Sequence, residues 1–141
     1  MKITIRLAAL LLAATVLPVS AQDDSLAGER LYQENCASCH GANLEGQPDW
    51  RSRLPNGGLP APPHDASGHT WHHTDRVLLD IVKRGTAAIV GNGYESDMPG
   101  FKEVLTDEEI TAIIDYIKNT WPDRIRASQE SRTLADEQVQ P

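Results

Sequence analysis

The chain has 141 residues, with 13 Lys and Arg against 20 Asp and Glu and a formal charge of −7. This length suits one domain with a tail, and the acidic balance argues against sequence-independent nucleic-acid binding, which needs a basic surface. Only 40% of the residues are hydrophobic and two are cysteines, which is little apolar content for a core and too few thiols for a disulfide-rich scaffold. We therefore expect something besides apolar side chains to help stabilise the chain.

The first 21 residues have the pattern of a targeting segment. Lys2 and Arg6 precede an almost wholly apolar run at 7–21 that ends in small residues. This pattern is typical of a secretory signal peptide, and the run is too short to span a bilayer. We expect cleavage after Ala21, which removes two cations and changes the formal charge from −7 to −9. The mature protein would then have no membrane span and would lie in an oxidising compartment, the periplasm. An uncleaved anchor is the alternative.

Apolar spacing in the mature chain predicts three main helices, at 25–35, 74–84 and 106–121. The first contains Gly28, which costs about 1 kcal/mol relative to Ala in a helix interior. Such a glycine suggests close approach by another element. The second and third helices each begin at a threonine that can cap the helix, and the third has a capping box. The residues concerned are Thr74, Thr106 and Glu109.

Two long segments lie outside the three predicted helices, and the first has no regular element of useful length. Residues 41–73 hold five Gly and five Pro, and so long a loop in a compact domain needs a task, such as wrapping a cofactor. Residues 122–141 are mixed-charge and poor in large apolar residues, so we expect a flexible or loosely helical polar tail. No strand-like alternation or repeat is present. The predicted organisation is a signal peptide at 1–21, an all-α domain at 22–121 and the tail at 122–141.

The chemistry is concentrated in the sequence Cys36-Ala37-Ser38-Cys39-His40. In an exported protein, Cys-x-x-Cys-His indicates covalent haem attachment. Two thiols three positions apart on one helical turn can bond the two vinyl-derived carbons of one haem edge, and His40 can reach the iron as proximal ligand. Its other ring nitrogen needs an acceptor, for which a backbone carbonyl at 60–63 is the candidate. The competing interpretations are a disulfide between Cys36 and Cys39, a thioredoxin-like redox pair, and a zinc site completed by histidines.

Further pieces accompany this motif in a fixed order along the chain. They are Gly28 and Tyr32, Cys36 to Gly41, Ala61-Pro62-Pro63, Met98-Pro99-Gly100-Phe101, and the last helix around Tyr116. Over 27–121 this ordered set resembles a monohaem class I c-type cytochrome. The resemblance implies the cytochrome c fold, with three main helices around one covalently bound haem c and with Gly28 and Tyr32 crossing the last helix near Tyr116. It also implies that a proline carbonyl accepts a hydrogen bond from the proximal histidine, and Pro62 matches that place best, with Pro63 adjacent.

Met98 is the first candidate for the sixth iron ligand, because it is the one methionine of the mature chain. A thioether is a soft ligand that favours reduced iron, and Pro99 constrains the loop after it. The alternatives are a methionine that fills a gap in the core and ligation by a second histidine. The loop histidines are His64, His69, His72 and His73. We expect them to be polar groups near the haem edge or solvent, and we expect Trp71 to donate its indole N–H to a haem propionate.

The predicted function follows from an iron with both axial positions filled, because such a site has only one outer-sphere task, one-electron transfer. The sequence predicts a periplasmic electron carrier, free or serving an oxidoreductase, rather than an enzyme. Its acidity predicts redox partners with a basic docking face and no nucleic-acid partner. The alternatives are a haem-based ligand sensor or peroxidase-like protein with a labile sixth ligand, and a copper-handling protein that uses the histidines at 69, 72 and 73.

Overall fold

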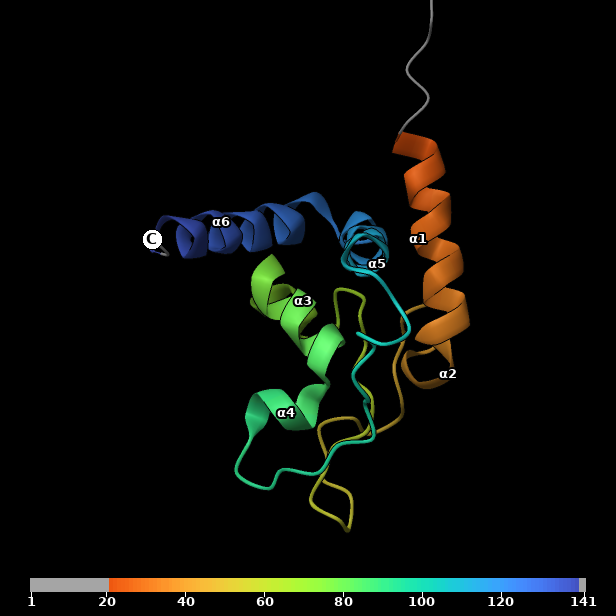
Figure 1. The fold of residues 1–141 in the computed structure, drawn as a ribbon, viewed down its shortest axis with the longest axis vertical. Coiled ribbons are helices and arrows are strands. Elements are labelled where there is room, and N and C mark those ends of the chain that lie inside the picture. The colour runs from red at the N-terminus through yellow and green to blue at the C-terminus, as the bar shows by residue number, and fades with distance from the viewer. Residues whose placement is uncertain (1–20, 140–141) are drawn as a thin grey trace, which may run out of the picture.

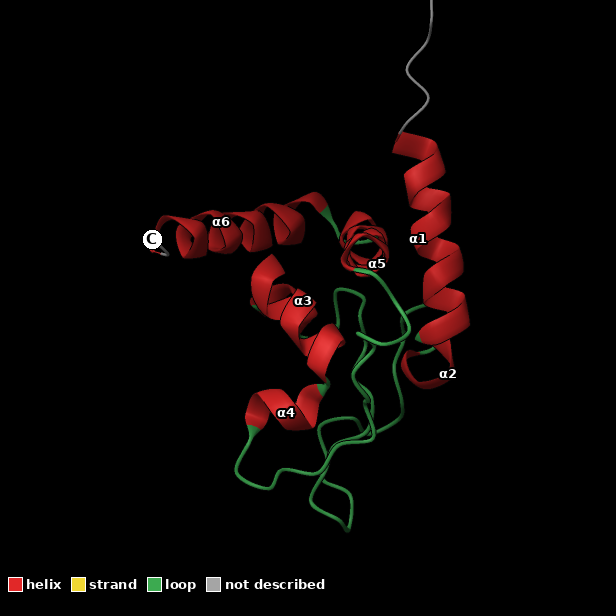
Figure 2. Ribbon diagram, in the orientation of Figure 1, coloured by secondary structure: helices red, strands yellow, loops and turns green. Residues whose placement is uncertain are grey.

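The computed structural model describes residues 21–139, which contain helices and loops but no strand (Figure 2). The elements in chain order are α1 (Ala21–Asn35), α2 (Ala37–His40), the 3₁₀ helix η1 (Thr70–His72), α3 (Asp75–Arg84), α4 (Thr86–Val90), α5 (Asp107–Asn119) and α6 (Asp123–Val139). The predicted all-α class is confirmed. The predicted signal peptide lies outside the described residues except for Ala21, the first residue of α1. Among the described helices, none combines the length and the apolar character that crossing a membrane requires.

The crossing of α1 and α5 is the centre of the fold. Figure 1 views α5 almost end-on while α1 runs in the plane of the picture, so the two helices cross steeply. A Cβ at Gly28 would collide with the Ala112 carbonyl oxygen and lie 3.1 Å from the Tyr116 Cβ. Tyr32 is fully buried, with its ring centroid 5.5 Å from that of Tyr116. The glycine and the tyrosine therefore lie at the crossing, where the resemblance placed them.

The buried face of α5 supplies much of the core. Its apolar stripe consists of Ile110, Ile113, Ile114 and Ile117, and Trp121 follows it. The predicted capping box begins the helix, because the Thr106 hydroxyl accepts from the Glu109 N–H and the Glu109 carboxylate accepts from the Thr106 N–H. Thr74 caps α3 by accepting from the Val77 N–H. Both caps satisfy N–H groups that have no partner inside the helix.

The structure differs from the sequence-based expectation at the C-terminal end. Residues predicted as a flexible or loosely helical tail form the regular helix α6, which lies across the N-terminal end of α3 (Figure 1). Gln129 of this helix is fully buried. The hydrogen bonds of α6 to the body come from polar side chains, and Ile125 packs against the core. Because the helix has no apolar stripe, its sequence gave no sign of this packing. The short helix α4 was not expected either, nor was η1 inside the long loop.

Two long loops, at 41–69 and 91–106, fill much of the region below α5 in the view of Figure 1. They approach each other closely, because a Cβ at Gly58 would lie 3.1 Å from the Glu95 carbonyl oxygen. The first loop follows the Cys-x-x-Cys-His turn, and the second carries Met98. The fold thus brings the loop that follows the Cys-x-x-Cys-His turn close to the loop that carries Met98.

Candidate functional site

The two cysteines lie on one helical turn at the end of α1. The Cys36 N–H donates to the Tyr32 carbonyl at 2.8 Å, and the His40 N–H donates to the Cys36 carbonyl at 2.9 Å. Both thiols are free, that of Cys36 half-buried and that of Cys39 exposed. Burial, with a smaller contribution from the neighbouring thiol, raises the pKa of Cys36 to about 11. Residues three apart on a helical turn share a face, so the two sulfurs can reach one flat ligand.

His40 is buried at the end of this turn and has one ring nitrogen engaged. Its Nδ1 lies 2.8 Å from the Pro62 carbonyl oxygen. A carbonyl can only accept, so Nδ1 carries the proton and Nε2 keeps its lone pair. Burial lowers the pKa of His40, and the hydrogen bond to Pro62 opposes that shift. The side chain is therefore a neutral imidazole suited to bind a metal through Nε2.

The Pro62 carbonyl is held in place by the long loop. The Gly46 N–H donates to the His40 carbonyl at 2.7 Å, and a Cβ at Gly46 would collide with the Pro63 nitrogen. The His64 N–H also donates to the carbonyl oxygen of the buried residue Leu44, at 2.8 Å. The loop wraps back onto the motif, so the acceptor for His40 is fixed by backbone contacts on both sides of Pro62.

His64 lies beside His40 in the structure. The two rings are stacked with centroids 4.0 Å apart and planes 21° apart. His64 Nδ1 lies 2.8 Å from the Thr70 hydroxyl, and its carbonyl accepts from the Trp121 indole N–H at 2.7 Å. Burial, followed by the charges of His40 and His69, lowers the pKa of His64. A metal held by His40 would need its second ligand on the opposite side, and a ring stacked on His40 is not placed there, so the position of His64 does not favour it as that ligand.

Met98 is held against the end of α3. A Cβ at Gly85 would lie 3.0 Å from the Met98 carbonyl oxygen, and a Cβ at Gly100 would lie 2.7 Å from the Lys83 carbonyl oxygen. Glycines at both positions thus let the two backbones touch. The Thr86 hydroxyl donates to the Met98 sulfur at 3.2 Å. A thioether sulfur has two lone pairs, so this hydrogen bond leaves one of them for a metal.

Trp71 has a buried donor without a partner. Its indole Nε1 makes no hydrogen bond within the described residues, and its ring stacks on His72 with centroids 3.8 Å apart. A buried polar group of this kind costs about 1–3 kcal/mol when unpaired. A bound group that presents a carboxylate would satisfy it. Together with two free thiols and a neutral imidazole, this donor fits a haem c with its propionates.

The remaining histidines form a separate aromatic group. The His69 ring stacks on Trp50 with centroids 5.5 Å apart and meets His73 edge to face at 5.5 Å. The Arg51 guanidinium lies 4.2 Å from the centre of the Trp50 ring. Within residues 21–139, no three His, Cys, Asp or Glu side chains are grouped so that they could hold a metal ion. This arrangement gives no support to the copper or zinc alternative.

Three contacts of the site were missed by the sequence reasoning. They are the hydroxyl of Thr86 on the Met98 sulfur, the close approach of Gly85 and Gly100, and the indole of Trp121 on the His64 carbonyl. Each joins positions far apart in the chain, and a single sequence contains no signal for such a pairing. Only Gly100 gave a partial sign, since it follows Met98-Pro99 in the ordered set of pieces that carries the resemblance.

Comparison with known proteins agrees with this site. The family model described as "Cytochrome c" matches residues 25–121. A cytochrome c-555 of Prosthecochloris aestuarii is 29% identical over 108 residues, which cover 70% of this chain and 89% of that protein. A nitrite reductase of Stutzerimonas stutzeri is 26% identical over 117 residues, which cover 79% of this chain but only 18% of the enzyme. No solved structure matches significantly. Because the family model covers most of the chain, including the Cys-x-x-Cys-His turn and Met98, the chain belongs to the cytochrome c family.

Proposed function

We propose that this chain is a periplasmic one-electron carrier with one haem c, attached through Cys36 and Cys39 and ligated by His40 and Met98. Membership of the cytochrome c family implies haem-based electron transfer and a covalently attached haem c. The ligand pair, the single haem and the compartment are the parts that we propose. When bound, the haem supplies an iron that alternates between the ferric and ferrous states.

The observation that carries the proposal is the hydrogen bond from His40 Nδ1 to Pro62, beside two free thiols on one turn. It fixes the ring orientation and leaves the Nε2 lone pair as the one that could bind a metal. A zinc site or a thioredoxin-like pair would need further ligands or βαβ patterning. The part of the chain that the structure describes offers neither a metal-holding cluster nor a strand.

Met98 is supported as the sixth ligand by its own contacts. Its sulfur is oriented by Thr86, and its backbone N–H donates to the Ser96 hydroxyl at 3.2 Å. A thioether ligand stabilises ferrous iron and raises the reduction potential. With both axial positions filled, no substrate would reach the iron, so outer-sphere electron transfer is the one task left.

The partners that we propose are redox proteins with a basic docking face, because the chain carries a formal charge of −7. Opposite charges would steer the encounter, and the association rate would fall as salt increases. The match to a small part of a nitrite reductase is compatible with a carrier that serves an oxidoreductase. The similarity does not extend to the rest of that enzyme, so we propose no nitrite chemistry.

The visible spectrum of the purified protein, together with a Met98→Ala variant, tests the proposal. We expect a low-spin ferrous spectrum that carbon monoxide changes little at neutral pH, and a mass that exceeds the mature sequence by one haem. Met98→Ala should lower the reduction potential and open the iron to carbon monoxide. Val104→Ala, at an exposed position of the same loop, is the matched control and should do neither.

Two results would contradict the proposal. A wild-type protein that is high-spin and binds carbon monoxide readily would favour the ligand sensor or peroxidase-like alternative. A Met98→Ala variant that keeps the native potential and spectrum would remove Met98 from the ligand role.

A further inference from the structure

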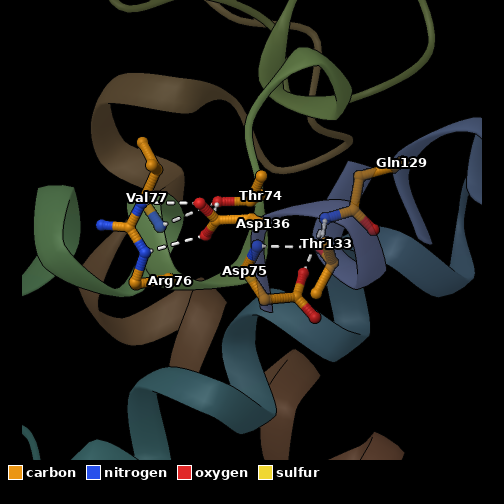
Figure 3. A network of polar contacts seen from close by, with 7 residues as sticks. All are labelled: Thr74, Asp75, Arg76, Val77, Gln129, Thr133 and Asp136. Atoms are coloured by element: carbon orange, nitrogen blue, oxygen red, sulfur yellow. Dashed lines mark hydrogen bonds and ion pairs between the residues drawn. The ribbon is translucent and has the colours of Figure 1, made fainter. Parts of the chain in front are cut away.

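The helix α6 begins after the residues that the family model matches, yet it is fastened to the body of the protein. Three of its polar side chains, Gln129, Thr133 and Asp136, are four and three positions apart and therefore share one face. That face meets the segment His73–Arg76, which runs from the end of η1 into the first turn of α3; Figure 3 shows these contacts from Thr74 onward. A solvated tail would not place these three groups against one short segment.

Gln129 forms the buried end of this interface. Its side chain has no exposed surface, and its Nε2 lies 3.2 Å from the His73 carbonyl oxygen and 2.6 Å from the Asp75 carboxylate. Thr133 lies one turn further along, where its hydroxyl accepts from the Asp75 N–H at 3.1 Å. These contacts satisfy backbone groups of the segment that leads out of η1, and burial makes each one costly to lose.

Asp136 forms the outer end of the interface. Its two carboxylate oxygens accept from Arg76 Nε and Nη2 at 2.8 Å each, a paired geometry that fixes orientation. The same carboxylate accepts from the Thr74 hydroxyl at 3.1 Å. The Arg76 side chain is 55% exposed and that of Asp136 20%, so solvent still screens the pair and its contribution is chiefly geometric.

The segment held by α6 begins two residues after Trp71. The helix also contacts η1 itself, and η1 carries the indole N–H that is buried without a partner. The backbone of η1 is closed only by short-range bonds, from the His72 N–H to His69 and from the His73 N–H to Thr70. A 3₁₀ turn this short has little stability of its own, so its position depends on what packs against it.

We propose that α6 positions Trp71: Gln129, Thr133 and Asp136 hold His73–Arg76 so that the indole N–H stays aimed at a haem propionate. The inference rests on the proposed function, because it requires the haem. An N–H donor on a propionate offsets negative charge near the iron and favours the ferrous state. The appended helix is thus a means of setting the reduction potential from outside the core of the domain.

The experiment measures the reduction potential of the haem-loaded, full-length protein in Gln129→Leu and Asp136→Asn variants. We expect both to lower the potential, and Gln129→Leu to lower it more because it removes the buried contacts. Hydrogen exchange of the His72 and His73 amides should speed up in the same order. Glu137→Gln removes a neighbouring exposed charge on α6 and is the matched control, which should change neither quantity.

A double-mutant cycle with Trp71→Phe separates positioning from general loosening. If α6 acts through the indole, Gln129→Leu should shift the potential little once the N–H is absent, and the two effects will not add. Asp136→Asn gives the same readout should Gln129→Leu fail to fold. Additive shifts, or a potential equal to wild type in both variants, would overturn the proposal. A wild type without a low-spin haem would instead overturn the proposed function, before any variant is compared.

Discussion

The Gly28→Ala substitution tests the crossing of α1 and α5 most directly. Alanine favours a helix over glycine, by about 1 kcal/mol, so on propensity alone the change should stabilise the protein. In the structure, the new Cβ would collide with the Ala112 carbonyl oxygen and lie 3.1 Å from the Tyr116 Cβ. The first of these atoms belongs to the backbone, so no rotamer change can relieve the collision.

The expected loss of stability is the steric cost of the added methyl group less the gain in helix propensity. Adding a methyl group to a packed interior costs about 1–3 kcal/mol, and a rigid backbone neighbour puts this case at the upper end. Subtracting the propensity gain of about 1 kcal/mol leaves a net loss of about 2 kcal/mol in the free energy of unfolding. With a urea dependence of about 1–3 kcal/mol per molar, the midpoint should fall by about 1 M.

The assay is urea unfolding followed by circular dichroism, with the haem attached in every variant. Glu29→Ala, at the exposed neighbouring position on α1, is the control and should change the free energy of unfolding by no more than about 0.5 kcal/mol. The reasoning is refuted if Gly28→Ala leaves the midpoint unchanged or raises it. In that event the gain in helix propensity would exceed the steric cost of the new Cβ, which would mean that α1 and α5 do not touch at Gly28.

Two further substitutions test the contacts that sequence reasoning missed. Thr86→Val removes the hydroxyl that donates to the Met98 sulfur at 3.2 Å while keeping the side-chain shape. If Met98 is the sixth ligand as proposed, its sulfur would become a stronger donor to ferric iron. A redox titration should then give a lower potential, and an unchanged value would count against the contact. Trp121→Phe removes the N–H that donates to the His64 carbonyl at 2.7 Å. Because that carbonyl loses a partner, we expect a loss of about 1–3 kcal/mol in the free energy of unfolding, and a loss near zero would show that the bond is not formed.

The elements that the sequence predicted well are those specified by neighbouring residues. The capping box of Thr106 and Glu109 lies within four positions, and so does the cap that Thr74 provides. The all-α class and the crossing at Gly28 also followed from local pattern and from the resemblance. Helix caps of this kind depend on residues that lie close together in the sequence, so they can be predicted without knowing the fold.

The parts that could not be predicted depend on distant partners. The helix α6 has no apolar stripe, and Gln129 and Asp136 find their partners more than fifty positions earlier in the chain. The same holds for Thr86, whose hydroxyl meets a sulfur twelve positions later across a loop. Polar docking of this kind leaves no periodic signal, because the residues involved are also common on solvated surfaces. The sequence therefore indicated a tail where the structure has a packed helix.

The crossing of α1 and α5 also constrains the order in which the protein can fold. Gly28 and Ala112 touch across more than eighty intervening residues, and closing so long a loop is slow because its entropy must be lost before the contact forms. A chain that grows from its N-terminus has no partner for α1 until α5 has been made. The packing that half-buries Cys36 in the folded protein is incomplete until then, whereas Cys39 stays exposed even after folding. The topology therefore leaves the Cys36 thiol more accessible for attachment chemistry during the interval before the core closes.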